Sequence, residues 1–108
     1  MKLKQFPMIY LSLWVNLMIV KITDYGSVGE KYFIDYEVRE ISHDQMNYLN
    51  DNLNEQTVIN DESFGLKMFF EEKLYPFQSD VAKIRLEDFI AREEIEMTIF
   101  LSSFLEDM

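Results

Sequence analysis

The fold is decided by one stretch of the sequence, residues 31–41, which reads KYFIDYEVREI. Apolar side chains fall at every second position of this stretch, with mostly charged side chains between them. Successive side chains of a β-strand point to opposite faces of a sheet, so this alternation predicts a strand with one buried face. The predicted buried face consists of Tyr32, Ile34, Tyr36 and Val38.

The residues before this strand predict a hairpin. Residues 8–22 are rich in β-branched and aromatic residues, which favours one long strand or two short ones. Residues 15–22 are apolar on both faces, as expected of a central strand. Residues 24–29 hold two of the three glycines and predict a turn longer than the two-residue type.

The residues after this strand predict a helix that begins at Ser42. Ser42 and Gln45 have the spacing of a capping box, in which each side chain bonds a free amide of the first turn. Met46, Leu49 and Leu53 share one helical face, and the helix is expected to end near residue 54.

The second half of the chain predicts three strands and a helix. The strands are expected at residues 57–59, 66–75 and 82–87, the second ending before Pro76. Residues 88–106 carry an apolar stripe at helical spacing, which Glu93 interrupts. A strand over residues 95–101 stays open as an alternative.

These elements predict one α+β domain over residues 1–108. We expect an antiparallel sheet of four to five strands, in the order ββαββα, packed with two helices.

Residues 6–20 form an uncharged, mostly apolar stretch that resembles part of a signal peptide or a membrane segment. The stretch is shorter than the roughly 20 residues that span a bilayer, and Lys21 ends it. We therefore favour buried strands over a membrane segment. The absence of cysteine and of glycosylation sequons favours the cytoplasm.

Charge is the most unusual property of the sequence. The formal net charge is −10, and residues 1–22 hold three lysines and no acidic residue, so all twenty acids lie in residues 23–108. Such a field repels nucleic acid phosphates and attracts the basic surface of a protein. We therefore expect a basic protein as partner and no direct nucleic acid binding.

No catalytic, cofactor or metal site is predicted. His43 is the single histidine, and three glycines are too few for a phosphate-binding loop. The chain has no cysteine and one histidine, which are too few ligands for a zinc site. Asn50, Asn52 and Asn54 imitate the start of a calcium loop, but Glu55 stands in place of its glycine.

A further metal pattern is too short to be specific. Asp61 followed by Glu71, Glu72 and Lys73 has the spacing of metal-dependent nucleases, but in so acidic a chain it can arise by chance. The adjacent carboxylate pairs, such as Glu71 and Glu72, point apart on any regular element, so we expect them on the surface.

Rows of acids on the two predicted helices remain as candidate binding residues. Regularly spaced carboxylates can imitate a phosphate backbone and fill the basic groove of a nucleic-acid-handling protein. The sequence thus predicts a non-enzymatic, stoichiometric inhibitor. Its candidate partner-binding residues are Asp44, Asp51, Glu55, Glu87, Glu94 and Glu96.

In composition the chain resembles the small, acidic, cysteine-free inhibitors that phages encode, such as DNA mimics and anti-defence (anti-CRISPR) proteins. An immunity protein or antitoxin is a variant of this hypothesis. The alternative is a structural or assembly subunit that forms oligomers through its apolar N-terminal stretch, and a homodimer stays open.

Overall fold

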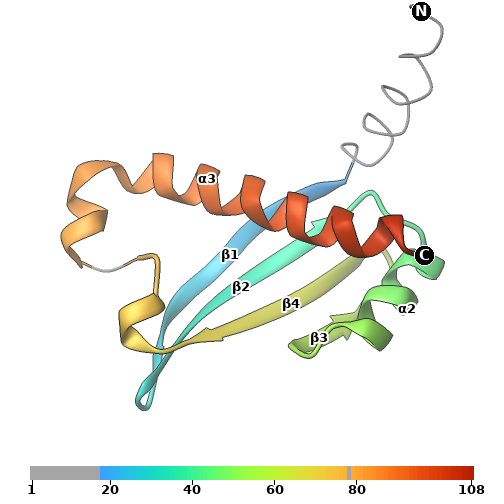
Figure 1. Ribbon diagram of the computed structural model, residues 1–108, viewed down its shortest axis with the longest axis horizontal. Coiled ribbons are helices and arrows are strands. Elements are labelled where there is room, and N and C mark those ends of the chain that lie inside the picture. The colour runs from blue at the N-terminus through green and yellow to red at the C-terminus, as the bar shows by residue number, and fades with distance from the viewer. Residues whose placement is uncertain (1–17, 78) are drawn as a thin grey trace, which may run out of the picture.

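The structure of the protein is a computed structural model that describes residues 18–77 and 79–108. Its strands form one antiparallel sheet in the order β1-β2-β4-β3, and the helices α2 and α3 cover one face of that sheet (Figure 1). The predicted α+β fold is therefore confirmed. The elements are β1 (Ile19–Val28), β2 (Lys31–Arg39), α2 (His43–Asn52), β3 (Gln56–Ile59), β4 (Ser63–Phe70), the 3₁₀ turn η1 (Glu72–Leu74) and α3 (Ser79–Glu106).

Strand β2 is a central strand, paired with β1 on one side and with β4 on the other. Its alternation follows the prediction from Ile34 to Val38, but Tyr32 is only half-buried, and Phe33 on the opposite face is buried. Ile34, Tyr36 and Val38 are buried under the helices, whereas Asp35 and Glu37 point to the face that the described helices leave uncovered.

The hairpin differs from the prediction. Strand β1 continues through Val28, and Val28 pairs directly with Lys31, so the turn has two residues rather than a long loop. Gly29 has φ +62°, as the first position of the tight type II′ turn requires. Gly26 belongs to the strand, where a Cβ would lie 3.6 Å from the Phe33 ring. The glycine that suggested a turn instead lies in the strand opposite Phe33, where an added Cβ would make an ordinary contact with the ring.

Helix α2 follows the prediction. Ser42 Oγ accepts a hydrogen bond from the Gln45 amide at 3.1 Å, and Gln45 Oε1 accepts one from the Ser42 amide at 2.8 Å. Both halves of the capping box are therefore present. Met46, Leu49 and Leu53 are buried, which places the helix against the sheet.

The second half of the chain contains one confirmed strand and two corrections. The short strand β3 is confirmed. The next strand, β4, spans Ser63–Phe70 rather than 66–75, because the chain turns into η1 before Pro76 is reached. Residues 82–87 are helical, because α3 begins at Ser79 and includes them. The helix predicted over 88–106 is confirmed, and the strand alternative for 95–101 is wrong.

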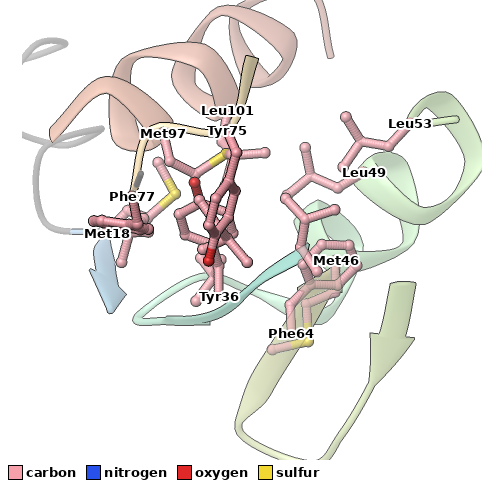
Figure 2. Close-up of a cluster of buried hydrophobic side chains, with 14 residues drawn as sticks. Met18, Tyr36, Met46, Leu49, Leu53, Phe64, Tyr75, Phe77, Met97 and Leu101 are labelled. Carbon is pink, nitrogen blue, oxygen red and sulfur yellow. The ribbon is translucent and has the colours of Figure 1, made fainter. Parts of the chain in front are cut away.

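The core lies between the sheet and the two helices (Figure 2). Phe64, Ile34, Val38, Leu49 and Leu101 come from four different elements and are completely buried. Their burial fixes both helices on the same face of the sheet.

The predictions for residues 8–17 and most of the apolar stretch 6–20 lie outside the described residues. Within the described ranges, no helix combines the length and the apolar character needed to cross a membrane.

Candidate protein-binding surface

Acidic and basic side chains are unevenly distributed among the helices and strands. Helix α2 carries two acids and no Lys or Arg, and α3 from residue 86 onward carries six acids against one base, Arg92. The four strands carry four bases against three acids. The layer formed by the two helices is therefore the acidic side of the described molecule.

On α2, the structure brings two of the predicted acids together. Asp44 and Asp51 are exposed and seven residues apart, which puts them on one stripe of the helix, about 10 Å apart along its axis. Glu55 lies beyond the end of α2 and is half-buried beside β3, so it does not continue this row.

On α3, the three predicted acids do not form one row. Glu87 and Glu94 share a stripe, but Glu96 lies about 200° further round the helix than Glu94. Glu87 and Glu96 are exposed. Glu94 is half-buried, and its Oε2 accepts a hydrogen bond from the Ile22 amide of β1 at 2.8 Å. This carboxylate therefore already has a partner inside the protein.

Glu93 is a carboxylate that the list of candidate residues did not include. Its place in the apolar stripe of α3 signals a sheet-facing side chain, and the structure has it half-buried over the sheet. Burial raises the pKa of Glu93, and the neighbouring Glu96 adds to the rise, while Arg92 opposes it. Burial also raises the pKa of Tyr36 on β2, and the charges of Glu93, Glu96 and Glu94 raise it further.

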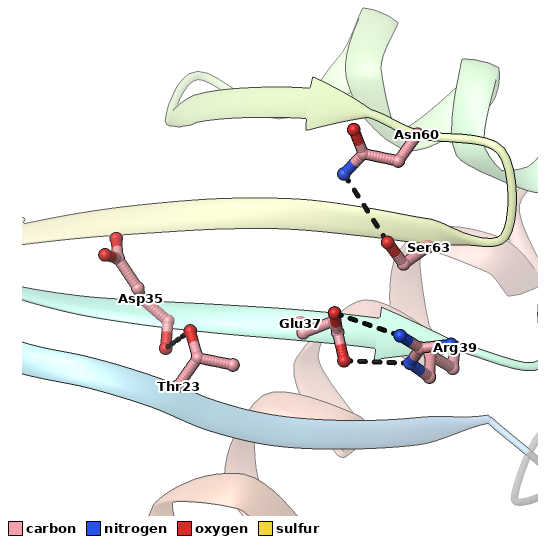
Figure 3. Close-up of polar contacts among 6 residues, drawn as sticks. All are labelled: Thr23, Asp35, Glu37, Arg39, Asn60 and Ser63. Carbon is pink, nitrogen blue, oxygen red and sulfur yellow. Dashed lines mark hydrogen bonds and ion pairs between the residues drawn. The ribbon is translucent and has the colours of Figure 1, made fainter.

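The uncovered face of the sheet has a different character. Here Glu37 forms an ion pair with Arg39, whose Nε lies 2.8 Å from Glu37 Oε1 (Figure 3). On the same face, Lys67 Nζ lies 3.5 Å from Asp35 Oδ1. The side chains on this face are thus partly neutralised by their own neighbours.

The metal patterns in the sequence are not assembled by the fold. Asp61 precedes β4 and Glu71 follows it, so eight strand residues, roughly 26 Å, separate the two parts of the nuclease-like spacing. Asn50 and Asn52 are part of α2 rather than a calcium loop. Among the residues the structure describes, no group of three or more candidate ligands is placed to hold a metal ion.

Comparison with known proteins gives a family but no activity. No curated protein matches the chain. A family model, described as a family of unknown function (DUF5750), matches residues 19–107, which run from the start of β1 to one residue beyond the end of α3. The match covers the whole sheet and both helices, and the chain therefore belongs to the DUF5750 family.

Proposed function

We propose that the protein is a non-enzymatic binding protein that docks the acidic side of its helical layer on a basic surface of another protein. The observation that carries the proposal is the separation of charge between the two layers, with eight acids and one base on α2 and on α3 from residue 86 onward. A surface of one sign speeds encounter with a partner of the opposite sign.

A nucleic-acid-handling protein is the partner class that this surface suits best. Such a protein presents rows of Lys and Arg that normally bind phosphates. Exposed carboxylates at Asp44, Asp51, Glu87 and Glu96 would compete for those rows, with Glu87 and Glu96 projecting from opposite sides of α3, nine residues apart. This competition would make the protein a stoichiometric inhibitor of DNA-mimic or anti-defence type. An immunity protein or antitoxin would use the same chemistry against a basic toxin. A cysteine-free chain is in keeping with a cytoplasmic partner.

The test compares two variants of equal net charge. The helix variant neutralises four exposed acids of α2 and α3: Asp44→Asn, Asp51→Asn, Glu87→Gln and Glu96→Gln. The control variant neutralises four exposed acids in turns: Glu30→Gln, Glu40→Gln, Asp61→Asn and Glu62→Gln. Each protein is immobilised and exposed to cell extract at low and at high salt.

The proposal expects the wild type and the control variant to capture the same basic nucleic-acid-binding protein at low salt. The helix variant should lose it, and high salt should release it. The captured protein, once purified, should lose nucleic acid binding at a one-to-one ratio of added wild type. Equal capture by the two variants, or capture without inhibition, would contradict the proposal.

A second candidate function is assembly, and one surface feature favours it. Ile95 and Ile99 of α3 are 60% and 64% exposed and line a groove beside Ile19 of β1, which is 43% exposed. Exposed apolar side chains that cluster in this way are typical of interfaces. A large homo-oligomer in sedimentation at high salt, dissociated by Ile95→Ser with Ile99→Ser, would favour assembly over inhibition.

A further inference from the structure

Ile95 and Ile99 are the most exposed large apolar side chains on the described part of α3. They are four residues apart, so they lie on neighbouring turns of one helical face. An α-helix turns by about 100° per residue, which puts Ile95 about 200° round the helix from Met97, a residue buried against the sheet. This face of α3 therefore points away from the core.

Between residues 95 and 101, α3 is apolar around most of its circumference. Met97 and Leu101 are buried in the core, whereas Ile95, Ile99 and Phe100 are exposed. A helix that is apolar on all sides is normally covered on all sides. The sheet covers one side of α3, so the face that carries the two isoleucines is a candidate contact for a partner (Figure 1).

The polar side chains beside the two isoleucines already use their hydrogen bond donors. Thr98 Oγ1 donates to the Glu94 carbonyl at 2.7 Å, and Ser102 Oγ donates to the Thr98 carbonyl at 2.6 Å. A buried donor without a partner is costly, but these two hydroxyls keep their acceptors when water is removed. A partner can therefore cover them without leaving an unpaired donor.

A groove of about 390 Å³ runs between α3 and the edge strand β1, and both isoleucines line it. The α3 residues of its lining run from Ala91 to Ile99, about 12 Å along the helix axis, which fits roughly two turns of another helix. An added strand fits less well, because Glu94 Oε2 already bonds the Ile22 amide at the edge of β1. The groove therefore suits a helix with an apolar stripe.

The charged side chains around the groove select the charge of that helix. Asp88 and Glu106 lie on the face of the isoleucines, seven residues before Ile95 and seven residues after Ile99. In total the bases near the groove are Lys21 and Arg92, and the acids are Asp88, Glu94, Glu96 and Glu106. Even if each base neutralises one acid, an acidic surplus remains.

This surplus distinguishes between two occupants. A second copy of the chain would bring two acidic rims together, and like charges repel. A helix whose apolar stripe is bordered by Lys or Arg would bring opposite charges together, which favours and speeds its binding. Charge therefore favours a basic amphipathic helix over a second copy.

We propose that the groove between α3 and β1 binds a basic amphipathic helix of the partner protein, with Ile95 and Ile99 as its apolar anchors. The inference rests on the proposed function, because it names the element that the acidic helical layer docks against. It separates two roles. The exposed acids speed the encounter, whereas the buried isoleucines slow the dissociation of the complex.

The test measures binding of short fluorescent peptides to the protein by fluorescence anisotropy. The probe is a peptide of leucine and lysine with the pattern of an amphipathic helix. An all-lysine peptide of the same length and an amphipathic leucine–glutamate peptide are the controls. Each is titrated at ionic strengths of about 0.01 M and about 1 M, between which the Debye length falls from roughly 30 Å to 3 Å.

The leucine–lysine peptide should bind most tightly at low salt and should keep measurable binding at high salt. The all-lysine peptide should lose its binding at high salt, because only charge holds it. The leucine–glutamate peptide should bind weakly at low salt, because the acidic surplus repels it.

A double substitution isolates the apolar part. Ile95→Ser with Ile99→Ser should weaken binding of the leucine–lysine peptide at high salt by on the order of tenfold, because two apolar side chains are no longer buried. It should leave binding of the all-lysine peptide at low salt unchanged. The matched control is Val28→Ser with Val58→Ser, two strand residues outside the groove that are 62% and 55% exposed, and it should bind both peptides as the wild type does.

Two results would overturn the inference and leave the proposed function standing. One is equal affinity of the leucine–lysine and all-lysine peptides, and the other is unchanged high-salt binding in the isoleucine variant. The proposed function fails separately if the helix variant (Asp44→Asn, Asp51→Asn, Glu87→Gln, Glu96→Gln) binds the all-lysine peptide as tightly as the wild type.

Other occupants of the groove give different results without any peptide. Self-association of the wild type that the isoleucine variant abolishes would assign the groove to a second copy. A change in the fluorescence of Trp14, the single tryptophan, in the isoleucine variant would assign the groove to the apolar N-terminal stretch of the chain. Either result would overturn the inference.

Discussion

The hydroxyl of Tyr75 is a buried polar atom with no well-formed hydrogen bond among the described residues. The side chain is 5% exposed, and its ring packs against Tyr32 at a centroid distance of 4.7 Å. Burial is the main cause that raises the pKa of Tyr75 to about 12. The residue therefore contributes its ring to the core, while its hydroxyl is desolvated with only the backbone of Gly26 as a weak partner, which opposes the rise of its pKa.

Tyr75→Phe is expected to stabilise the protein by about 1 kcal/mol, because it removes a buried hydroxyl that has no well-formed hydrogen bond and keeps the ring. Thermal unfolding should shift upward by roughly 4 °C for a domain of this size. Tyr25→Phe, at a half-buried ring of the same cluster, is the control and should change little. A loss of stability in Tyr75→Phe would mean that the hydroxyl is hydrogen-bonded in solution.

Glu93 supports a prediction about pH. Its pKa is raised in the folded protein, mainly by burial, so the folded state holds the proton more tightly than the unfolded state does. Its contribution is favourable below its ordinary pKa of 4.5 and is lost as the pH rises through the higher folded value. At pH 7 the ionised side chain is therefore a cost.

Glu93→Gln should thus stabilise the protein at pH 7, by about 0.5 kcal/mol once the partial exposure is discounted. The gain over wild type should shrink as the pH falls through the raised pKa of folded Glu93 toward 4.5 and level off below 4.5, which urea unfolding at several pH values would measure. Glu87→Gln, an exposed neighbour on α3, is the control. If the stability gain of Glu93→Gln does not change with pH, then its cause is packing and not the ionisation of Glu93.

At the scale of elements, β1 is an edge strand of ten residues, and long exposed edges invite pairing with another chain. Two of its amides are bonded by carboxylates. The Ile22 amide donates to Glu94 Oε2 at 2.8 Å, and the Tyr25 amide donates to Asp24 Oδ1 at 2.9 Å. A register irregularity lies between Ile22 and Asp24. Together these features protect the edge from strand addition.

Glu94→Ala with Asp24→Ala should therefore increase self-association, because two amides of the edge lose their partners. Light scattering at increasing protein concentration would measure it. Glu94→Gln with Asp24→Asn removes the same charge and keeps oxygen acceptors, so it should remain closer to the wild type. If both double variants associate equally, the loss of charge repulsion causes the association. The loss of the hydrogen bonds between the strand amides and the carboxylates would then not be the cause.

Patterns among neighbouring residues of the sequence were enough to predict β2 and α2. Alternation fixed the buried face of β2, and the Ser42–Gln45 spacing fixed the start of α2, since both depend on neighbouring residues. The prediction failed where contacts between distant segments decide. Gly26 belongs to β1, where it pairs with Phe33 of β2, and residues 82–87 alternate like a strand but are part of the longer helix α3.

The candidate protein-binding surface was likewise predictable where it depends on neighbouring residues, and not where it depends on contacts between distant segments. Helical spacing placed Asp44 and Asp51 on one exposed stripe of α2. It did not reveal that Glu94 bonds the Ile22 amide, because 72 residues separate the two.

At the scale of the whole molecule, the two layers differ in charge. The helical layer holds many acids and few bases, whereas the acids of the uncovered sheet face are paired with Lys67 and Arg39. Repulsion between carboxylates should therefore arise mainly in the helical layer. It opposes folding, because folding brings those charges closer together.

This repulsion predicts that salt stabilises the protein. Between about 0.01 and 0.15 M ionic strength the Debye length falls from roughly 30 Å to 8 Å, which screens charges on neighbouring helical turns only partly but screens those across the layer well. The melting temperature of the wild type should rise over this range. The helix variant (Asp44→Asn, Asp51→Asn, Glu87→Gln, Glu96→Gln) should have a higher melting temperature at low salt, and its melting temperature should increase less with salt.

The control variant shows whether the salt dependence comes from the position of the acids or only from the total net charge. Its changes are Glu30→Gln, Glu40→Gln, Asp61→Asn and Glu62→Gln. It has the same net charge as the helix variant, but its four changes lie in turns, apart from the helical acids. If the acids of the helices repel one another as a group, the control should keep most of the salt dependence of the wild type. If both variants lose the salt dependence of the melting temperature to the same extent, only the total net charge matters and the position of the acids does not. The acidic side would then have no special field with which to attract a basic partner.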